Sequence, residues 1–230
     1  MSLLGEGRHR SGDDGRMGKE KHGTFTVLTV CTGNVHRSAL AAELLATWAK
    51  WYLPPTVATH VAVTSAGTGA PVGEPMGQDL QNVAARLGAQ GGDHRATQLT
   101  DQQIVGADLV LVASEAHRDE IVSRVPRAMR RTFTMLEAGR IASQLEVQPP
   151  RSLKDLNAVV GELARRRVGG GDPGADDIVD PQGKDITATD LMVSQEVPAL
   201  VQIAVALWGM PPGEATAYLA AASDPASLRR

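Results

Sequence analysis

The sequence TFTVLTVCTGNVHRSALAAELL at residues 24–45 carries the most informative pattern in this chain. Residues 24–31 form a nearly continuous apolar run rich in β-branched side chains, which is typical of a strand buried on both faces of a parallel sheet. From Ser38 onward, apolar residues recur at helical spacing until the prolines at 54–55 end the helix. The stretch therefore predicts a central strand, a tight loop and a helix, in that order.

The same alternation continues downstream. Further strands are predicted at 60–68, 107–114 and 131–136, and helices at 76–88 and 115–125. Strands that alternate with helices favour a doubly wound α/β fold, with a four-stranded parallel sheet and helices on both faces. Ligands of such sheets bind beyond the carboxyl ends of the strands, where Cys31 lies in this sequence.

After residue 136 the pattern becomes helical. Residues 137–176 are predicted to contain extra helices, inserted before residue 177 and followed by a linker rich in Gly and Asp. A long closing helix is expected at 188–210, with Pro198 either kinking it or dividing it in two. The predicted domain thus covers 24–210, and 211–230 forms a C-terminal extension with a short helix and a tail.

Length and composition indicate a soluble globular protein. A chain of 230 residues fits one domain, and the net charge of −3 gives no reason to expect a nucleic-acid partner. No apolar run approaches the ~20 residues that span a bilayer, so no membrane partner is expected. One cysteine excludes an intrachain disulfide and gives no sign of a zinc cluster, so the cytoplasm is the default location. Residues 1–23 are polar and Gly-rich, which predicts a disordered tail, part of which could originate from cloning.

The loop between the first strand and helix has the features of an anion site. Backbone N–H groups before a helix N-terminus attract negative charge, and Gly33 and Asn34 permit unusual backbone angles there. Arg37 offers two parallel donors to an oxyanion, and Ser38 could cap the helix or donate to sulfur. A thiol at such a position is held largely as a thiolate at neutral pH. Taken alone, the loop also permits an inert core Cys31 beside a surface arginine.

Four motifs in order resemble the low-molecular-weight protein tyrosine phosphatases. These are VCTGNVHRS at 30–38, SAGTGAPVGEP at 65–75, DHRATQLT at 93–100 and DIVDPQG at 177–183. The resemblance implies the phosphatase I, flavodoxin-like fold, and the Gly- and Ala-rich style is similar to actinobacterial branches of the family. It also makes the inert Cys31 interpretation much weaker.

The resemblance implies hydrolysis of a phosphomonoester through a phosphocysteine, without metal or cofactor. Cys31 would be the nucleophile, Arg37 would hold phosphate oxygens, and Asp180 would be the general acid and later the base. Ser38 would stabilise the departing thiolate, while Asn34 and His94 would brace the loop. The phosphate-binding loop would comprise Thr32, Gly33, Asn34, Val35, His36, Arg37 and Ser38.

This sequence departs from the family pattern at the pocket wall. Gln182 and Ala70 or Pro71 stand where phosphotyrosine enzymes usually place aromatic side chains, and the tryptophans at 48, 51 and 208 are expected in the core. His36 replaces a frequent second cysteine and is expected to fill space at the pocket rim, with a catalytic role as the alternative. Phosphotyrosine is therefore in doubt as the natural substrate.

Two other functions stay open. One is an arsenate reductase coupled to a small thiol, and the other is a non-catalytic module that binds phosphate or a phosphoprotein. The expected partner is a phosphorylated small molecule or a phosphoprotein, and the chain is expected to be a monomer or a weak dimer. Whether the helices at 137–166 cover the site or bind a partner stays open from the sequence.

Overall fold

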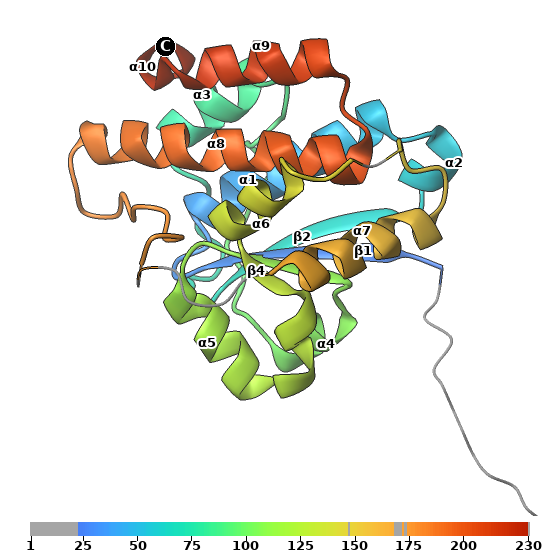
Figure 1. Cartoon of the computed structure of the whole chain (residues 1–230). Coiled ribbons are helices and arrows are strands. Elements are labelled where there is room, and N and C mark those ends of the chain that lie inside the picture. The colour runs from blue at the N-terminus through green and yellow to red at the C-terminus, as the bar shows by residue number, and fades with distance from the viewer. Residues whose placement is uncertain (1–22, 147, 168–171, 173, 230) are drawn as a thin grey trace, which may run out of the picture.

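The computed structural model describes residues 23–146, 148–167, 172 and 174–229. The predicted tail lies outside the described residues except for Gly23, as does part of the predicted linker. The fold is built on a four-stranded sheet of order β2-β1-β3-β4, in which every neighbouring pair is parallel. Its strands are β1 (Phe25–Cys31), β2 (Val61–Gly67), β3 (Leu109–Val112) and β4 (Thr132–Thr134). The first strand is thus internal, as predicted (Figure 1).

Helices connect the strands and cover both faces of the sheet, which confirms the doubly wound fold. They are α1 (Arg37–Tyr52), α2 (Pro55–Ala58), α3 (Gln78–Arg86), α4 (Asp101–Gly106), α5 (Glu115–Arg124), η1 (Pro126–Arg131), α6 (Met135–Ala142), α7 (Leu153–Arg166), α8 (Ile186–Trp208), α9 (Pro212–Ala222) and α10 (Pro225–Leu228). The short α4 was missed in the sequence analysis, although its capping box between Thr100 and Gln103 is a recognisable start signal.

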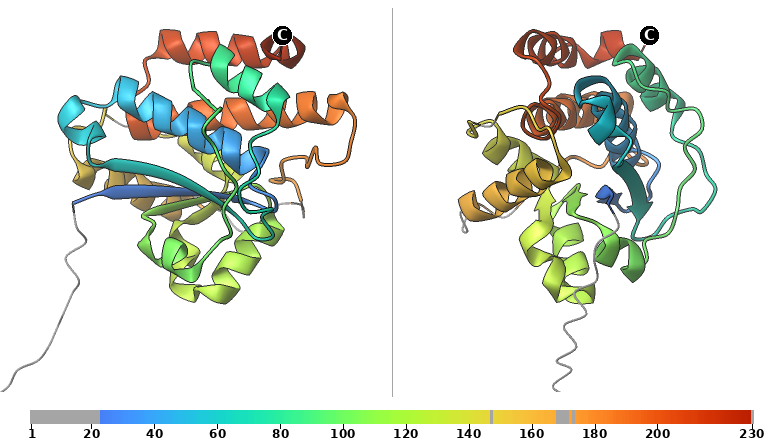
Figure 2. Two further views of the ribbon diagram at one scale, coloured as in Figure 1. Left: turned by 180° about the vertical axis from the view of Figure 1, so that it is seen from behind. Right: turned by 90° about the vertical axis from the view of Figure 1, so that its right-hand side faces the viewer.

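The two faces of the sheet bury unequal cores. The larger one packs side chains of α1, α6, α7 and α8 against Phe25, Val27, Leu109, Leu111 and Phe133. The smaller one packs α4 and α5 against Leu28, Val30, Val110 and Val112. Figure 2 shows α1, α8 and α9 on one side of the sheet and α4 and α5 on the other. Alternate residues of β1 therefore serve both cores, which explains its almost unbroken apolar sequence.

The long helix α8 is continuous through Pro198. Of the two outcomes expected from the sequence, a kink or a division, the division is therefore excluded. On length and composition this helix could cross a membrane, contrary to the sequence-based expectation that no run would qualify. However, 67% of its apolar window is buried inside the protein. It is therefore the central core helix of this fold, and its burial against α1 and α6 compensates for the hydrogen bond that proline removes.

The C-terminal residues pack onto the domain. Helices α9 and α10 lie over α8 and α3, with Leu228 buried and Arg229 paired with Asp190 of α8 at 2.7 Å. Trp48 and Trp208 are fully buried as expected, and Trp48 stacks against Tyr218 of α9. The core assignment of Trp51 was wrong, because its side chain is 53% exposed. It follows the last buried turn of α1, where the helix turns that position outward.

Candidate active site

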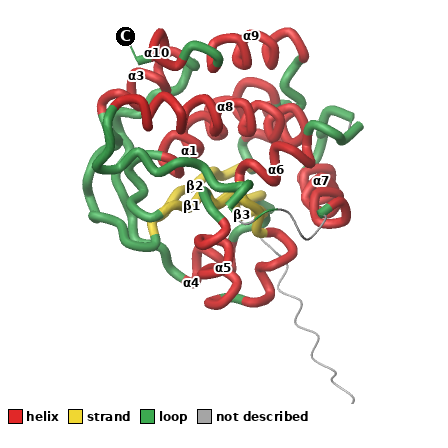
Figure 3. The backbone as a smooth tube through the Cα atoms, turned by 60° about the vertical axis from the view of Figure 1, so that its left-hand side comes forward, coloured by secondary structure: helices red, strands yellow, loops and turns green. Residues whose placement is uncertain are grey.

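The loop between β1 and α1 lies at the carboxyl end of the sheet, where connecting segments gather (Figure 3). Asn34 has a φ of 54°, the one non-Gly residue with positive φ in the described part of the chain. Its left-handed conformation bends the backbone back toward the strand, and asparagine tolerates this geometry better than most residues. The predicted role of Asn34 in the turn is consistent with this backbone.

The sulfur of Cys31 sits inside this turn. Cys31 is only 2% exposed, and its Sγ accepts a hydrogen bond from the Asn34 N–H at 3.3 Å. Ser38 Oγ lies 3.0 Å from the sulfur and also accepts a hydrogen bond from Asn34 Nδ2 at 3.0 Å. Ser38 keeps its own proton while it accepts from Asn34, so it can donate that proton to a thiolate at Cys31. Two donors thus point at Sγ, an arrangement that stabilises a thiolate.

Asn34 is itself braced from the neighbouring segment. Its side-chain oxygen accepts a hydrogen bond from the Thr97 N–H at 2.9 Å, and its carbonyl accepts one from His94 Nε2 at 2.6 Å. Burial lowers the pKa of His94, so the neutral ring donates its single N–H to this carbonyl. Asn34, Ser38 and His94 therefore occupy the supporting positions that were predicted for them.

The loop amides form the second feature of an anion site. Within the described part of the chain no acceptor contacts the amide N–H groups of Thr32, Gly33, Val35, His36, Arg37 and Ser38. These donors precede or begin α1, a 16-residue helix, so its dipole adds partial positive charge at the same place. The loop therefore offers donors to an oxyanion without loss of any protein hydrogen bond.

Two glycines act here through close approach. The expectation that Gly33 needs an unusual backbone angle was wrong, since its φ is not in the positive region. A Cβ at Gly33 would instead lie 3.3 Å from Gln182 Oε1, which shows that the Gln182 side chain reaches over the loop. A Cβ at Gly67 would lie 2.4 Å from the Thr32 carbonyl oxygen, so only glycine permits β2 to end against the loop.

Asp180 reaches the loop through contacts made by the residues before it. The Ile178 N–H donates to the Ala113 carbonyl just beyond β3 at 2.9 Å, and the Val179 N–H donates to Gln195 Oε1 of α8 at 2.9 Å. The Asp180 side chain, 40% exposed, then lies 2.6 Å from Arg37 through its Oδ2. The structure thus brings the aspartate of one predicted motif against the arginine of the motif that also contains Cys31.

Arg37 is nearly buried, with 4% exposure. Besides its ion pair with Asp180, it donates from Nη1 to the Ile178 carbonyl at 3.2 Å, while its Nε has no partner among the described residues. The guanidinium is thereby held in one orientation between the loop and the Asp180 segment. An oxyanion in the loop would compete with Asp180 for the same guanidinium, which couples binding to the position of the aspartate.

His36 occupies the N-cap position of α1 but makes no capping hydrogen bond through its side chain. Its half-buried ring lies next to Gly77, and the Val35 carbonyl accepts a hydrogen bond from the Gly77 N–H at 3.3 Å. Burial is the largest cause that lowers the pKa of His36. The location is consistent with the predicted space-filling role at the pocket rim.

Sequence reasoning missed several residues at this site. His117 of α5 contacts Thr32 in the loop, and Ser114 contacts His117. Glu196 of α8 is fully buried, and neither carboxyl oxygen has a hydrogen-bond partner among the described residues. Burial raises the pKa of Glu196 well above its usual range, and the Arg37 charge and a contact with the Ala41 backbone too poorly aligned to count as a hydrogen bond offset this only in part. Helical spacing could have flagged an acid among the apolar residues of the closing helix.

Glu196→Met is expected to stabilise the protein by about 1–3 kcal/mol at pH 7, since the variant removes an unpaired buried polar group. The carboxyl binds its proton more tightly in the folded state. Below the unfolded pKa the carboxyl is protonated in both states, so its ionisation costs the folded state nothing. The free energy of unfolding then falls as pH rises from there toward the folded pKa. The gain from the variant should thus be smaller at pH 4.5 than at pH 8, as measured by urea unfolding.

Glu137→Met is the matched control for this experiment. Glu137 is also buried, but it pairs with Arg167 at 2.9 Å, so its removal should destabilise the protein. Equal losses of stability in both variants would contradict the interpretation of Glu196 as an unpaired acid.

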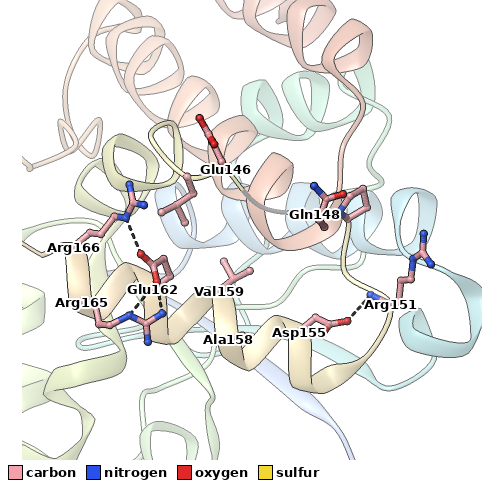
Figure 4. Close-up of a pocket in the computed structure, with 11 residues that line it drawn as sticks. Glu146, Gln148, Arg151, Asp155, Ala158, Val159, Glu162, Arg165 and Arg166 are labelled. Atoms are coloured by element: carbon pink, nitrogen blue, oxygen red, sulfur yellow. Dashed lines mark hydrogen bonds and ion pairs between the residues drawn. The ribbon is translucent and has the colours of Figure 1, made fainter.

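A groove of the structure lies away from this loop. It has a volume of about 660 Å³ and is lined by α7 and the segment before it, where Glu162 pairs with Arg165 and Arg166 (Figure 4). No residue of the loop at 31–38 lines it. No group of three or more His, Cys, Asp or Glu side chains that could hold a metal ion occurs in the described residues.

Comparison with known proteins agrees with this geometry. Residues 26–166 match the model of the family described as low molecular weight phosphotyrosine protein phosphatase. The chain belongs to this family. The phosphatase is 39% identical over 112 residues to a probable low molecular weight protein-tyrosine-phosphatase EpsP of Ralstonia nicotianae, covering 49% of this chain and 71% of the relative. It is 37% identical over 111 residues to a protein-arginine-phosphatase of Geobacillus stearothermophilus, covering 48% and 69%.

Solved structures extend the similarity beyond the aligned region. The YwlE arginine phosphatase of Geobacillus stearothermophilus is 28% identical, with a TM-score of 0.53 over 78% of this chain and 90% of that one. A YwlE mutant from Bacillus subtilis, at 23% identity and a TM-score of 0.54, shows the shared fold. The protein is therefore a cysteine-dependent phosphatase of the protein-tyrosine-phosphatase type. The family match ends before residue 180, so the place of Asp180 rests on the contacts described above.

Proposed function

We propose that this phosphatase hydrolyses phosphomonoesters through a phosphocysteine formed at Cys31. The observation that carries the proposal is the sulfur that accepts hydrogen bonds from Asn34 and Ser38, at the start of a loop with free amide donors. The thiolate attacks phosphorus, the bond from phosphorus to the ester oxygen breaks, and its electron pair leaves with that oxygen. The loop amides and Arg37 stabilise the charge on the three remaining oxygens.

Asp180 protonates the leaving oxygen in this proposal. Its carboxyl group lies at the edge of the site beside Arg37, partly exposed and therefore accessible to a bound substrate. In the second step Asp180 takes a proton from water, which attacks phosphorus and breaks the bond from phosphorus to sulfur. Ser38 then donates to the departing thiolate, and inorganic phosphate is released.

The test measures hydrolysis of aryl phosphates by the wild type and Asp180→Asn. Loss of the proton donor should lower kcat about 10²- to 10⁴-fold for poor leaving groups and much less for acidic phenols. Equal loss for every leaving group would show that Asp180 is not the general acid. Arsenate-dependent oxidation of a small thiol is measured in parallel. If the protein oxidises the thiol but does not hydrolyse aryl phosphate, arsenate reduction replaces the phosphatase mechanism. Binding of phosphate without turnover in either assay would instead indicate a binding module.

The proposed substrates are phosphorylated protein side chains or small phosphate esters in the cytoplasm. The phosphatase is proposed to act on them as a monomer or a weak dimer. The Gln182 side chain, rather than an aromatic ring, reaches over the loop, so strong selection for phosphotyrosine is not proposed. Phosphoarginine is a second candidate, since one relative is named a protein-arginine-phosphatase and the rim carries the polar groups of Thr32 and Gln182. Hydrolysis rates on matched peptides that carry either a phosphate ester or phosphoarginine decide between these two substrate classes.

A further inference from the structure

A chain of three hydrogen-bonded side chains ends in the phosphate-binding loop. Ser114 is the N-cap of α5, and its Oγ accepts from the His117 N–H at 3.4 Å and contacts His117 Nδ1 at 2.5 Å. The other ring nitrogen, Nε2, lies 3.0 Å from Thr32 Oγ1. Ser114 and His117 are each 8% exposed, so water has little access to compete with these bonds. Neither residue has a part in the reaction steps above.

The bonds of Ser114 allow one arrangement of protons along the whole chain. Its oxygen already accepts from the backbone of α5 and keeps one proton, which it can donate to His117 Nδ1. Burial, with a smaller effect of Arg37, lowers the pKa of His117 to about 4, so the ring is neutral at physiological pH. A neutral ring that accepts at Nδ1 carries its proton on Nε2. In this tautomer the ring donates to Thr32.

Thr32 receives this bond on its oxygen, which leaves its own proton free of the protein. The Thr32 hydroxyl contacts no other side chain in the described part of the structure, and the residue is exposed directly after Cys31. A hydroxyl that rotates freely could present a lone pair or a proton to the substrate. One that accepts from a buried histidine has one lone pair occupied and keeps its proton for a second partner.

We propose that Ser114 and His117 are positioning residues that orient the Thr32 hydroxyl as a hydrogen-bond donor to an acceptor atom of the bound substrate, next to the sulfur of Cys31. The inference rests on the proposed function and adds a specificity element to it. Substrates with an acceptor beside the phosphoryl group, such as a phosphoryl or ester oxygen, gain this bond. His117, which orients this donor, comes from a helix distant in sequence and connects α5 to the loop.

The proton arrangement is tested on the wild-type protein by long-range ¹H–¹⁵N NMR of the histidine rings at pH 7. The His117 signals are assigned by their loss in His117→Gln. Protonated Nε2 and unprotonated Nδ1 are the expected result, whereas a proton on Nδ1 would overturn the proposal. This measurement does not depend on turnover. It therefore tests the hydrogen-bonded chain from Ser114 to Thr32 separately from the proposed reaction, which Cys31→Ser tests.

The functional link is tested with a double-mutant cycle of His117→Leu and Thr32→Val on an aryl phosphate. His117→Leu should lower kcat/KM about three- to tenfold in the wild-type background and have no further effect in Thr32→Val. His117→Gln should restore most of the loss, because the glutamine amide can donate from nearly the same place as Nε2. Equal loss from His117→Leu in both backgrounds, or no rescue by glutamine in a folded variant, would overturn the role of His117 as the donor to Thr32.

Discussion

Cys31→Ser is expected to lower kcat by about 10⁴-fold or more on any phosphomonoester, because it removes the nucleophile. A serine hydroxyl stays protonated at neutral pH. The hydrogen bonds from Asn34 and Ser38 can stabilise an existing thiolate, but they do not remove the proton of a serine. The measurement is steady-state hydrolysis of an aryl phosphate with single-turnover trapping of the phosphoenzyme.

The control for this variant is binding of inorganic phosphate, followed by calorimetry. The loop amides and Arg37 remain in Cys31→Ser, so phosphate should bind within a few-fold of the wild-type affinity. Full turnover in the variant would show that the proposed nucleophile is wrong. Loss of phosphate binding together with activity would point to collapse of the loop rather than loss of the nucleophile.

Arg37→Lys is expected to lower kcat about 10³-fold or more, with a smaller change in KM. The planar guanidinium holds Asp180 at 2.6 Å and the Ile178 carbonyl at 3.2 Å, and it is shaped to contact two phosphate oxygens at once. Lysine supplies a point charge on a different geometry, so stabilisation of the transition state is lost even though the net charge is kept.

Arg124→Lys provides the matched control for Arg37→Lys. Arg124 pairs with Asp101 and Glu120 at the surface of α5, and surface pairs of this kind contribute about 0–1 kcal/mol. Its kcat should equal that of the wild type. Activity of Arg37→Lys within tenfold of this control would exclude a role of the guanidinium fork in the transition state.

Much of the loop could be predicted from a short stretch of sequence. The apolar run of β1 predicts a buried strand, and the helical spacing after Ser38 predicts α1, so Cys31 is placed at a sheet end and a helix start without any distant residue. Asn34 was expected to tolerate left-handed backbone angles, and it adopts them. These features depend on neighbours within a few positions, which is why local patterns reveal them.

Other predictions failed where distant packing prevailed. Gly33 was expected to supply an unusual backbone angle, yet its φ is not positive, and the side chain of Gln182, almost 150 residues further along the sequence, lies over it. Pro198 was expected to kink or divide the closing helix, and the division is excluded because α8 runs through it as one helix buried against α1 and α6. Trp51 looked like a core residue by composition, but its place on the helix turns it outward.

The primary sequence alone was enough to specify the phosphate-binding loop, because the strand, turn and helix around Cys31 are encoded by adjacent residues. The rest of the site depends on contacts between distant segments. Arg37 meets the segment of Asp180 only because Ile178 bonds to the end of β3 and Val179 to α8, across a separation of 141 residues. His117 and Glu196 likewise come to the loop through packing of α5 and α8, since no local pattern encodes which buried polar groups will meet.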